Sequence, residues 1–326
     1  MKQTAAVLLV SAFVMGCDSA GNPFSTNSGA ATAPTTTPTT PVATGIPAGI
    51  AGDVDSVTFD PTTNTLSVTG VTLDNVPITT VYTRTPSLDK GGFLAYTTQD
   101  DPLDRHFTAL AAQGTSVRAA VAGSPLPRNR TFRGAFFERD GGYTPPAVTA
   151  TTGLVSYVGD YAGVTNGGDP NPQNLLSTTI ADPELQPFQA LLVDGDVFLN
   201  ADFADGSVEG NIINRRLIQS DGTTTDLPSL VLIASDVDTN GNFSGTVEYD
   251  ILDPLGATNG AFTQVGTYAG LFGGPDASEV AGAVDLTEFD GVGDAVLGED
   301  AETESGAFVL QSCATAAANP ICAQIP

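Results

Sequence analysis

Apolar and polar residues alternate along several segments of this chain, and this period of two is the feature that most restricts its fold. In the clearest segment, residues 191–203, the odd-numbered positions are apolar or glycine and the even-numbered ones are acidic or amide residues, except Leu192 and Phe198. Asp205-Gly206 then predicts a tight turn, with residues 207–219 as the return strand. Since no window holds a convincing helical period, the pattern predicts an all-β protein.

Similar segments, separated by turn residues, recur from residue 151 onward. They predict eight strands, at 151–164, 188–204, 207–219, 228–236, 242–252, 261–272, 278–288 and 304–311, with 165–187 as a long loop. Glycines recur at positions expected to face the core, at Gly195, Gly210, Gly245, Gly282 and Gly306. Glycine inside a strand permits bends and close approach, and eight strands can close a barrel filled by side chains. We therefore expect an eight-stranded antiparallel β-barrel over residues 148–312.

A set of shorter predicted strands precedes the barrel. Val57 and Phe59 are expected to pair with Leu66 and Val68 across a turn. We expect these strands to form a small β handle-like subdomain over residues 53–147, packed on the barrel.

The N-terminus has the pattern of an export signal. Lys2 is followed by an apolar run of about ten residues, far short of the roughly 20 that a membrane-spanning helix needs. Val14-Met15-Gly16-Cys17 resembles a lipobox, so we expect residues 1–16 to be removed and the Cys17 thiol to carry acyl chains such as palmitate. The alternative is an ordinary signal peptide with a chance cysteine.

The next segment predicts a tether. Residues 21–49 are mostly Ala, Thr, Pro, Ser and Gly without a charged residue, so we expect a disordered tether over residues 17–52. Lipid-anchored at Cys17, the protein would lie in the cell envelope, most simply at the outer membrane, facing the surface or the periplasm. Asp18 also resembles the signal that retains enteric lipoproteins at the inner membrane.

Two cysteines remain near the C-terminus. Cys313 and Cys322 are expected to form a disulfide in an oxidising compartment, closing a tail over residues 313–326. The alternative, a metal or redox pair, lacks the two-residue spacing and a nearby histidine.

The charge of the chain restricts its partners. With 37 acidic against 11 basic residues and a net charge of −26, the chain repels nucleic acid and anionic lipid. A solvated acidic surface is the simplest interpretation; a basic protein partner or divalent cations are alternatives.

One segment resembles half of a calcium loop. Asp236, Asp238 and Asn240 offer oxygen ligands at positions 1, 3 and 5, and Gly241 follows at position 6. Val247 occupies position 12, where the bidentate glutamate is due. An Asn-Gly hairpin turn explains the same residues, and we favour that interpretation.

Catalytic motifs are scarce. His106, the single histidine, follows a polar turn at 100–105 and enters a predicted strand. The sequence offers no phosphate-binding glycine loop and no paired-carboxylate motif, so we expect neither an enzyme nor a cofactor.

Residues 272–282 (FGGPDASEVAG) resemble a signature of transferrin-binding protein B and the related surface lipoproteins exported through the Slam machinery. Segments 153–164 and 202–210 are similar to the family's first barrel strand and second hairpin. Gly273 and Ala281 depart from the signature. The resemblance implies one handle-plus-barrel lobe over residues 53–311, where the transferrin receptor has two.

The resemblance implies a non-enzymatic binding lipoprotein in iron or other nutrient acquisition, with a protein ligand or a TonB-dependent receptor as partner. A structural or adhesive envelope lipoprotein without a transported ligand is the alternative, and a periplasm-facing accessory protein is a third. The family's ligand contacts lie on variable loops, so no ligand-binding residue carries over.

Overall fold

The computed structural model describes residues 45–71, 76–125, 131–149, 152–169, 172–179, 182, 185–255, 263–287 and 302–324. The predicted signal, Cys17 and most of the predicted tether lie outside these residues.

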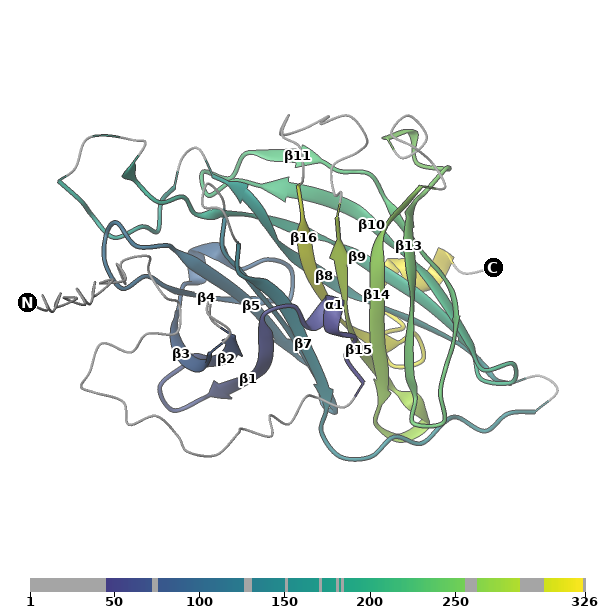
Figure 1. Cartoon of the computed structure of the whole chain (residues 1–326). Helices are drawn as coiled ribbons and strands as arrows, with labels where there is room; N and C mark the ends of the chain where they lie inside the picture. Colours follow the sequence, from purple (N-terminus) through teal and green to yellow (C-terminus); the bar gives the residue numbers. More distant parts are fainter. Residues whose placement is uncertain are drawn as a thin grey trace, which may run out of the picture.

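The C-terminal strands form a closed antiparallel barrel (Figure 1). Its eight strands are β8 (Leu154–Gly168), β9 (Ala190–Asp202), β10 (Ser207–Ile218), β12 (Leu230–Asp236), β13 (Asn242–Tyr249), β14 (Gln264–Gly273), β15 (Glu279–Leu286) and β16 (Glu304–Ser312). They pair in the order 10-12-13-14-15-16-8-9, and β9 pairs again with β10. A short strand, β11 (Thr224–Asp226), adds to β10. The predicted all-β class and eight-stranded barrel are confirmed, although β8 runs into the expected loop, as far as Gly168.

Aromatic rings from neighbouring strands fill the spaces that glycines leave inside the barrel. Gly245 pairs with Tyr268, and a Cβ at Gly245 would lie 2.5 Å from that ring. Gly282 pairs with Phe308 in the same way. The inward-facing glycines therefore mark close approach between strands, and the barrel interior is a packed core.

The N-terminal strands form a second antiparallel sheet, which we call the handle. Its strands are β1 (Val54–Asp60), β2 (Thr65–Val71), β3 (Pro77–Arg84), β4 (Leu94–Thr98), β5 (Phe107–Gln113), β6 (Val117–Gly123) and β7 (Arg133–Arg139), paired in sequence order. The sheet curls until β1 and β7 are in contact, which nearly closes it. The expected pairing of Val57 with Val68 and of Phe59 with Leu66 is confirmed.

Short helices complete the fold: α1 (Ala48–Ala51) and the 3-10 helices η1 (Pro86–Leu88), η3 (Pro275–Ala277) and η4 (Pro320–Gln324). Helix α1 corrects the expected tether over residues 17–52. Ile46 and Ile50, four residues apart, are buried in the same core cluster as handle residues. Composition predicted a tether, but these two isoleucines give its end an apolar face that packs.

The handle packs against one side of the barrel through small side chains. The outward-facing barrel residues in the shared core include Ala162, Ala269, Ala281, Ala283 and Ala307. Leu192, which interrupts the polar face of its strand, is buried in this core too, so the handle covers it. At the C-terminus the Cys313–Cys322 disulfide forms, as expected, and the Cys313 N–H donates to the Ser156 carbonyl oxygen.

Candidate functional site

The two ends of the barrel differ in the length of their connections. Because antiparallel strands alternate in direction, every second connection lies at the same end. Three short connections, 203–206, 237–241 and 274–278, lie at one end, which we call the turn end. The connections at the opposite end, the loop end, are all long: 169–189, 219–229, 250–263 and 287–303. Residues that bind partners are concentrated on such loops when a rigid scaffold holds them.

Large apolar side chains are exposed on the loop end. They belong to two of its four connections, 169–189 and 250–263, and are Leu176, Leu185, Ile251, Leu252 and Leu255. Leu252 is 87% exposed, the largest fraction among the described exposed hydrophobic side chains. Single exposed apolar residues are ordinary, whereas several of them at one end of a barrel mark a candidate interaction surface.

Aspartate side chains join the long connections to one another. The Ser220 N–H donates to Asp169 Oδ2 (2.5 Å), which links the first connection to the second. The Ser229 N–H donates to Asp253 Oδ2 (2.8 Å), which links the second to the third. A carboxylate that accepts a backbone N–H makes a stronger hydrogen bond than a neutral acceptor does. The loop end is therefore cross-braced where these segments meet the barrel.

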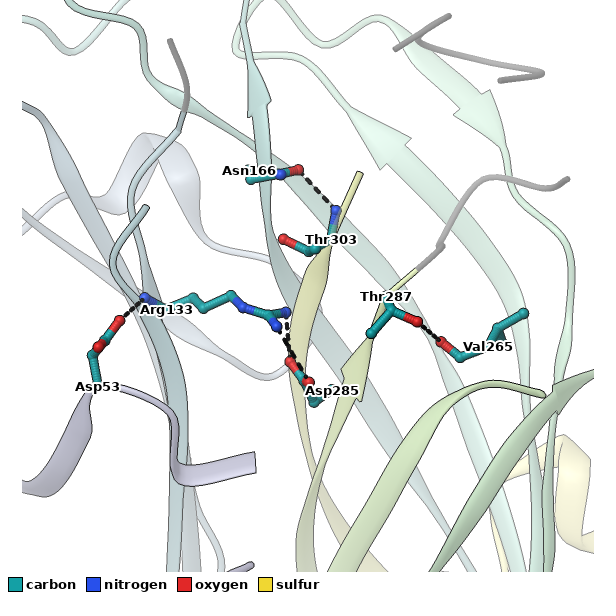
Figure 2. A network of polar contacts seen from close by, with 7 residues as sticks. All are labelled: Asp53, Arg133, Asn166, Val265, Asp285, Thr287 and Thr303. Atoms are coloured by element: carbon teal, nitrogen blue, oxygen red, sulfur yellow. Dashed lines mark hydrogen bonds and ion pairs between the residues drawn. The ribbon is translucent and has the colours of Figure 1, made fainter. Parts of the chain in front are cut away.

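The last connection is held where β16 begins. The Thr303 N–H donates to Asn166 Oδ1 (2.9 Å), and the Thr287 hydroxyl donates to the Val265 carbonyl oxygen (3.1 Å), as Figure 2 shows. These bonds tie the strand ends that flank residues 287–303 to β8 and β14. The ends of this connection are thus held against the barrel.

A buried ion pair lies inside the barrel beneath the loop end. A β-bulge in β10 sets Asn214 and Arg215 opposite Gly195, with Asn214 at φ 54°. The Arg215 guanidinium reaches Glu304, with 2.7 Å between Nη2 and Oε2, and both side chains are fully buried. The Tyr161 hydroxyl donates to Glu304 Oε1. A bulge commonly re-aims a side chain in this way.

The ion pair organises two of the long connections from inside. Arg215 Nη1 donates to the carbonyl oxygen of Pro228 (2.6 Å), in connection 219–229. Glu304 is the first residue of β16, directly after connection 287–303. Burial, followed by the nearby Glu304 charge, raises the pKa of Tyr161 well above its usual value, so its hydroxyl remains a donor. Arg215 thus anchors the base of the loop end.

The burial pattern of β10 indicates the bulge that holds Arg215. Core-facing positions in β10 are even-numbered up to Ile212, yet Leu217, also buried, is odd-numbered. Such a change of phase within one strand indicates a bulge between the two residues. The partner of Arg215 is 89 residues away, and nothing local identifies it.

The signature segment has a structural role at the turn end. Glu279 accepts the N–H groups of Thr115 (2.9 Å) and Ser116 (2.6 Å), in the hairpin turn between β5 and β6. The Arg139 guanidinium donates to the Phe272 carbonyl oxygen (2.8 Å). These contacts join the handle to the barrel, so the signature marks their interface.

An ion pair also joins the handle to the barrel, as Figure 2 shows. Arg133 in β7 contacts Asp285 in β15, with 2.6 Å between Nη1 and Oδ1. Burial raises the pKa of Asp285, while the Arg133 charge opposes that shift. The Arg133 N–H donates to Asp53 Oδ2 (3.2 Å), which fixes the start of β1 beside β7.

Asp238, part of the calcium candidate, is engaged within its own hairpin. Its Oδ1 accepts the N–H groups of Asn240 and Asn242, both at 2.8 Å. Burial opposes this effect, but the hydrogen bonds lower the pKa of Asp238 below its usual value. Asp236 ends β12, and Gly241 has a positive φ of 76°. Calcium binding by Asp236, Asp238 and Asn240 stays an untested alternative to the turn.

His106 lies in the handle core and is 1% exposed. Burial lowers its pKa to about 4, and neither ring nitrogen has a hydrogen-bond partner among the described residues. It lies next to the start of β5.

Among the residues that the structure describes, no group of three or more His, Cys, Asp or Glu side chains is placed to hold a metal ion. In the same residues, no helix has the length and hydropathy to cross a membrane.

Comparison with known proteins yields solved structures of transferrin-binding protein B. No family model and no curated protein sequence matches the chain. A double mutant from Haemophilus parasuis Hp5 is 13% identical (TM-score 0.35), the match covering 81% of this chain and 55% of that one. The isotype 1 protein from serogroup B Neisseria meningitidis is 16% identical (TM-score 0.32), with 80% and 53% covered.

A mutant from Actinobacillus pleuropneumoniae H49 is 13% identical (TM-score 0.33), with 81% of this chain and 99% of that chain covered. This chain spans about half the length of the structures from Haemophilus parasuis and Neisseria meningitidis. At low identity, the chain is similar to these solved structures of transferrin-binding protein B.

Proposed function

We propose that this chain is a lipid-anchored, surface-displayed binding protein without catalytic activity, and that the loop end of its barrel contacts the partner. The observation that carries the proposal is the asymmetry of the barrel: all four long connections leave the same end. The barrel interior supports it, because rings such as Tyr161, Tyr268 and Phe308 fill the interior and leave the outer surface for binding.

A protein is the partner class that fits this end. Five exposed apolar side chains on two connections suit an extended surface better than a small molecule, which is usually enclosed in a pocket. The bracing by Asp169, Asp253 and Arg215 limits the conformational entropy that the connections lose on binding.

The remaining parts have supporting roles. Cys17 anchors the protein to the outer membrane, and residues 17–45 tether it. The handle (53–147) and the tail (313–326) flank the barrel (148–312). In this arrangement the protein captures a ligand for a TonB-dependent receptor in iron or other nutrient uptake.

Photo-crosslinking on intact cells tests the loop end. Leu252 and Leu154 are each replaced by p-benzoylphenylalanine; Leu154, at the turn end, is also strongly exposed (67%) and serves as the matched control. The cells are irradiated in their natural growth medium, and crosslinked adducts are separated by molecular mass. We expect an adduct at position 252 and none at position 154. Equal adducts, or one at position 154 alone, would reject the loop end as the contact surface.

A further inference from the structure

The handle contains a cavity of about 280 Å³, whose lining residues lie between Val57 and Phe136 in the sequence. Its lining is mostly apolar and consists of Val57, Phe59, Leu66, Gly92, Leu94, Tyr96, Ala111, Ala112, Gln113, Arg118, Ala119, Ala120 and Phe136. We call it the handle cavity. Phe59 and Leu94 line it while 39% and 42% exposed, so it opens to solvent beside them.

Short side chains on two adjacent strands create this cavity. Residues paired directly across a sheet project from the same face, and Ala111 of β5 pairs with Ala120 of β6. Phe136 of β7 pairs with Ala120, and so projects from that face too. Tyr96, on β4, lines the cavity beyond β5. Leu94 of β4, two residues from Tyr96, pairs with Ala111, so the two alanines lie between larger side chains and leave a slot within the nearly closed sheet.

We propose that the handle cavity is a second binding site, which takes an uncharged apolar molecule of about ten non-hydrogen atoms. The size follows from the volume, because a cavity of roughly 150 Å³ lined by apolar side chains holds benzene. The lining supplies the apolar surface, and the rings of Tyr96 and Phe136 offer flat contact faces.

Charge excludes an ionic ligand from this site. Arg118 is the single charged side chain in the lining, and Glu138 pairs with it at 2.5 Å. An anion would have to displace Glu138, and a cation would meet no unpaired carboxylate in the lining. Both would lose hydration in an apolar slot, which is costly for a charge without a partner.

Direct titration tests the site on the full chain with Cys17→Ser, which needs no detergent because it carries no acyl chains. The probe is 2-naphthol, an uncharged fluorescent molecule of suitable size, and its comparison is anionic 2-naphthoate. We expect saturable binding of 2-naphthol and about tenfold weaker binding of 2-naphthoate. Absence of saturable binding overturns the site, and equal binding overturns its preference for an uncharged ligand.

Variants locate the probe. Ala111→Leu and Ala120→Leu each extend a side chain into the cavity, and each should weaken 2-naphthol binding at least about tenfold. Ala111 is partly exposed and so tolerates the larger residue more readily than buried Ala120, and it decides the result if Ala120→Leu fails to fold. Ala204→Leu, at an exposed turn-end position, adds the same apolar surface elsewhere and should bind as the parent does. Unchanged binding by folded Ala111→Leu would overturn the assignment.

Discussion

Replacing Arg215 with methionine should destabilise the barrel strongly. Methionine matches the unbranched aliphatic part of arginine but lacks the guanidinium, so the Glu304 carboxylate remains buried with Tyr161 as its hydrogen-bond donor. The Pro228 carbonyl oxygen also loses the donor that holds connection 219–229.

The magnitude follows from the complete burial of both partners, each with a side-chain exposure of 0%. Removing one partner of a buried ion pair costs about 3–5 kcal/mol, because the other charge is left uncompensated. Arg215→Met should therefore lower the free energy of unfolding by about 4 kcal/mol, a large share of the roughly 5–15 kcal/mol typical of a folded domain.

Urea unfolding at pH 7 measures this loss, and a double-mutant cycle separates the ion pair from packing effects. Glu304→Gln alone leaves Arg215 buried without its anion and should cost a similar amount. The double variant Arg215→Met/Glu304→Gln contains no buried charge and should recover most of the stability. A loss below about 1 kcal/mol in Arg215→Met, or no recovery in the double variant, would refute the reasoning.

Three further predictions concern the handle, its interface and the tail. Burial lowers the pKa of His106 from its ordinary 6.5 to about 4. Below about pH 6.5 the unfolded chain therefore binds a proton at His106 that the folded chain does not bind. Between pH 7 and 4, the free energy of unfolding measured in urea should fall by up to about 3 kcal/mol more in the parent than in His106→Phe. Parallel plots of this free energy against pH for the two proteins would contradict the prediction. Glu279→Gln weakens the charge-assisted hydrogen bonds from the Thr115 and Ser116 N–H groups. It should lower the free energy of unfolding by about 1–2 kcal/mol and speed amide exchange of Thr115. Unaltered exchange would show that the carboxylate does not hold the hairpin. Replacing Cys313 and Cys322 by serine opens a bridge between residues nine apart, and should cost about 2–3 kcal/mol and expose the tail to carboxypeptidase, whereas an equally resistant tail would count against the bridge.

Most of the barrel could be predicted from the sequence because its information is local. The period of two places each strand, and turn residues such as Asp205-Gly206 separate the strands, so the eight predicted strands match the observed ones to within a few residues. The pairing of Val57 with Val68 was also predictable, because one short turn joins their strands.

The site was less predictable because it depends on long-range contacts. The partnership of Arg215 with Glu304 requires the barrel to close, and only the phase change before Leu217 hints at the bulge. The role of Glu279 requires the handle to be docked on the barrel. Burial of Ile50 was missed because the flanking composition is typical of a tether. The gathering of long connections at one end follows from strand order and was within reach of sequence analysis.

Protease shaving of intact cells tests most directly the claim that this is a surface-displayed binding protein. Cells are treated with a protease that cannot cross the outer membrane, then blotted for this protein and for a periplasmic control. The account predicts that this protein is lost while the control survives, and that Cys17→Ser releases the protein from the membrane fraction. Full protection of the protein in intact cells, with digestion after lysis, would contradict surface display.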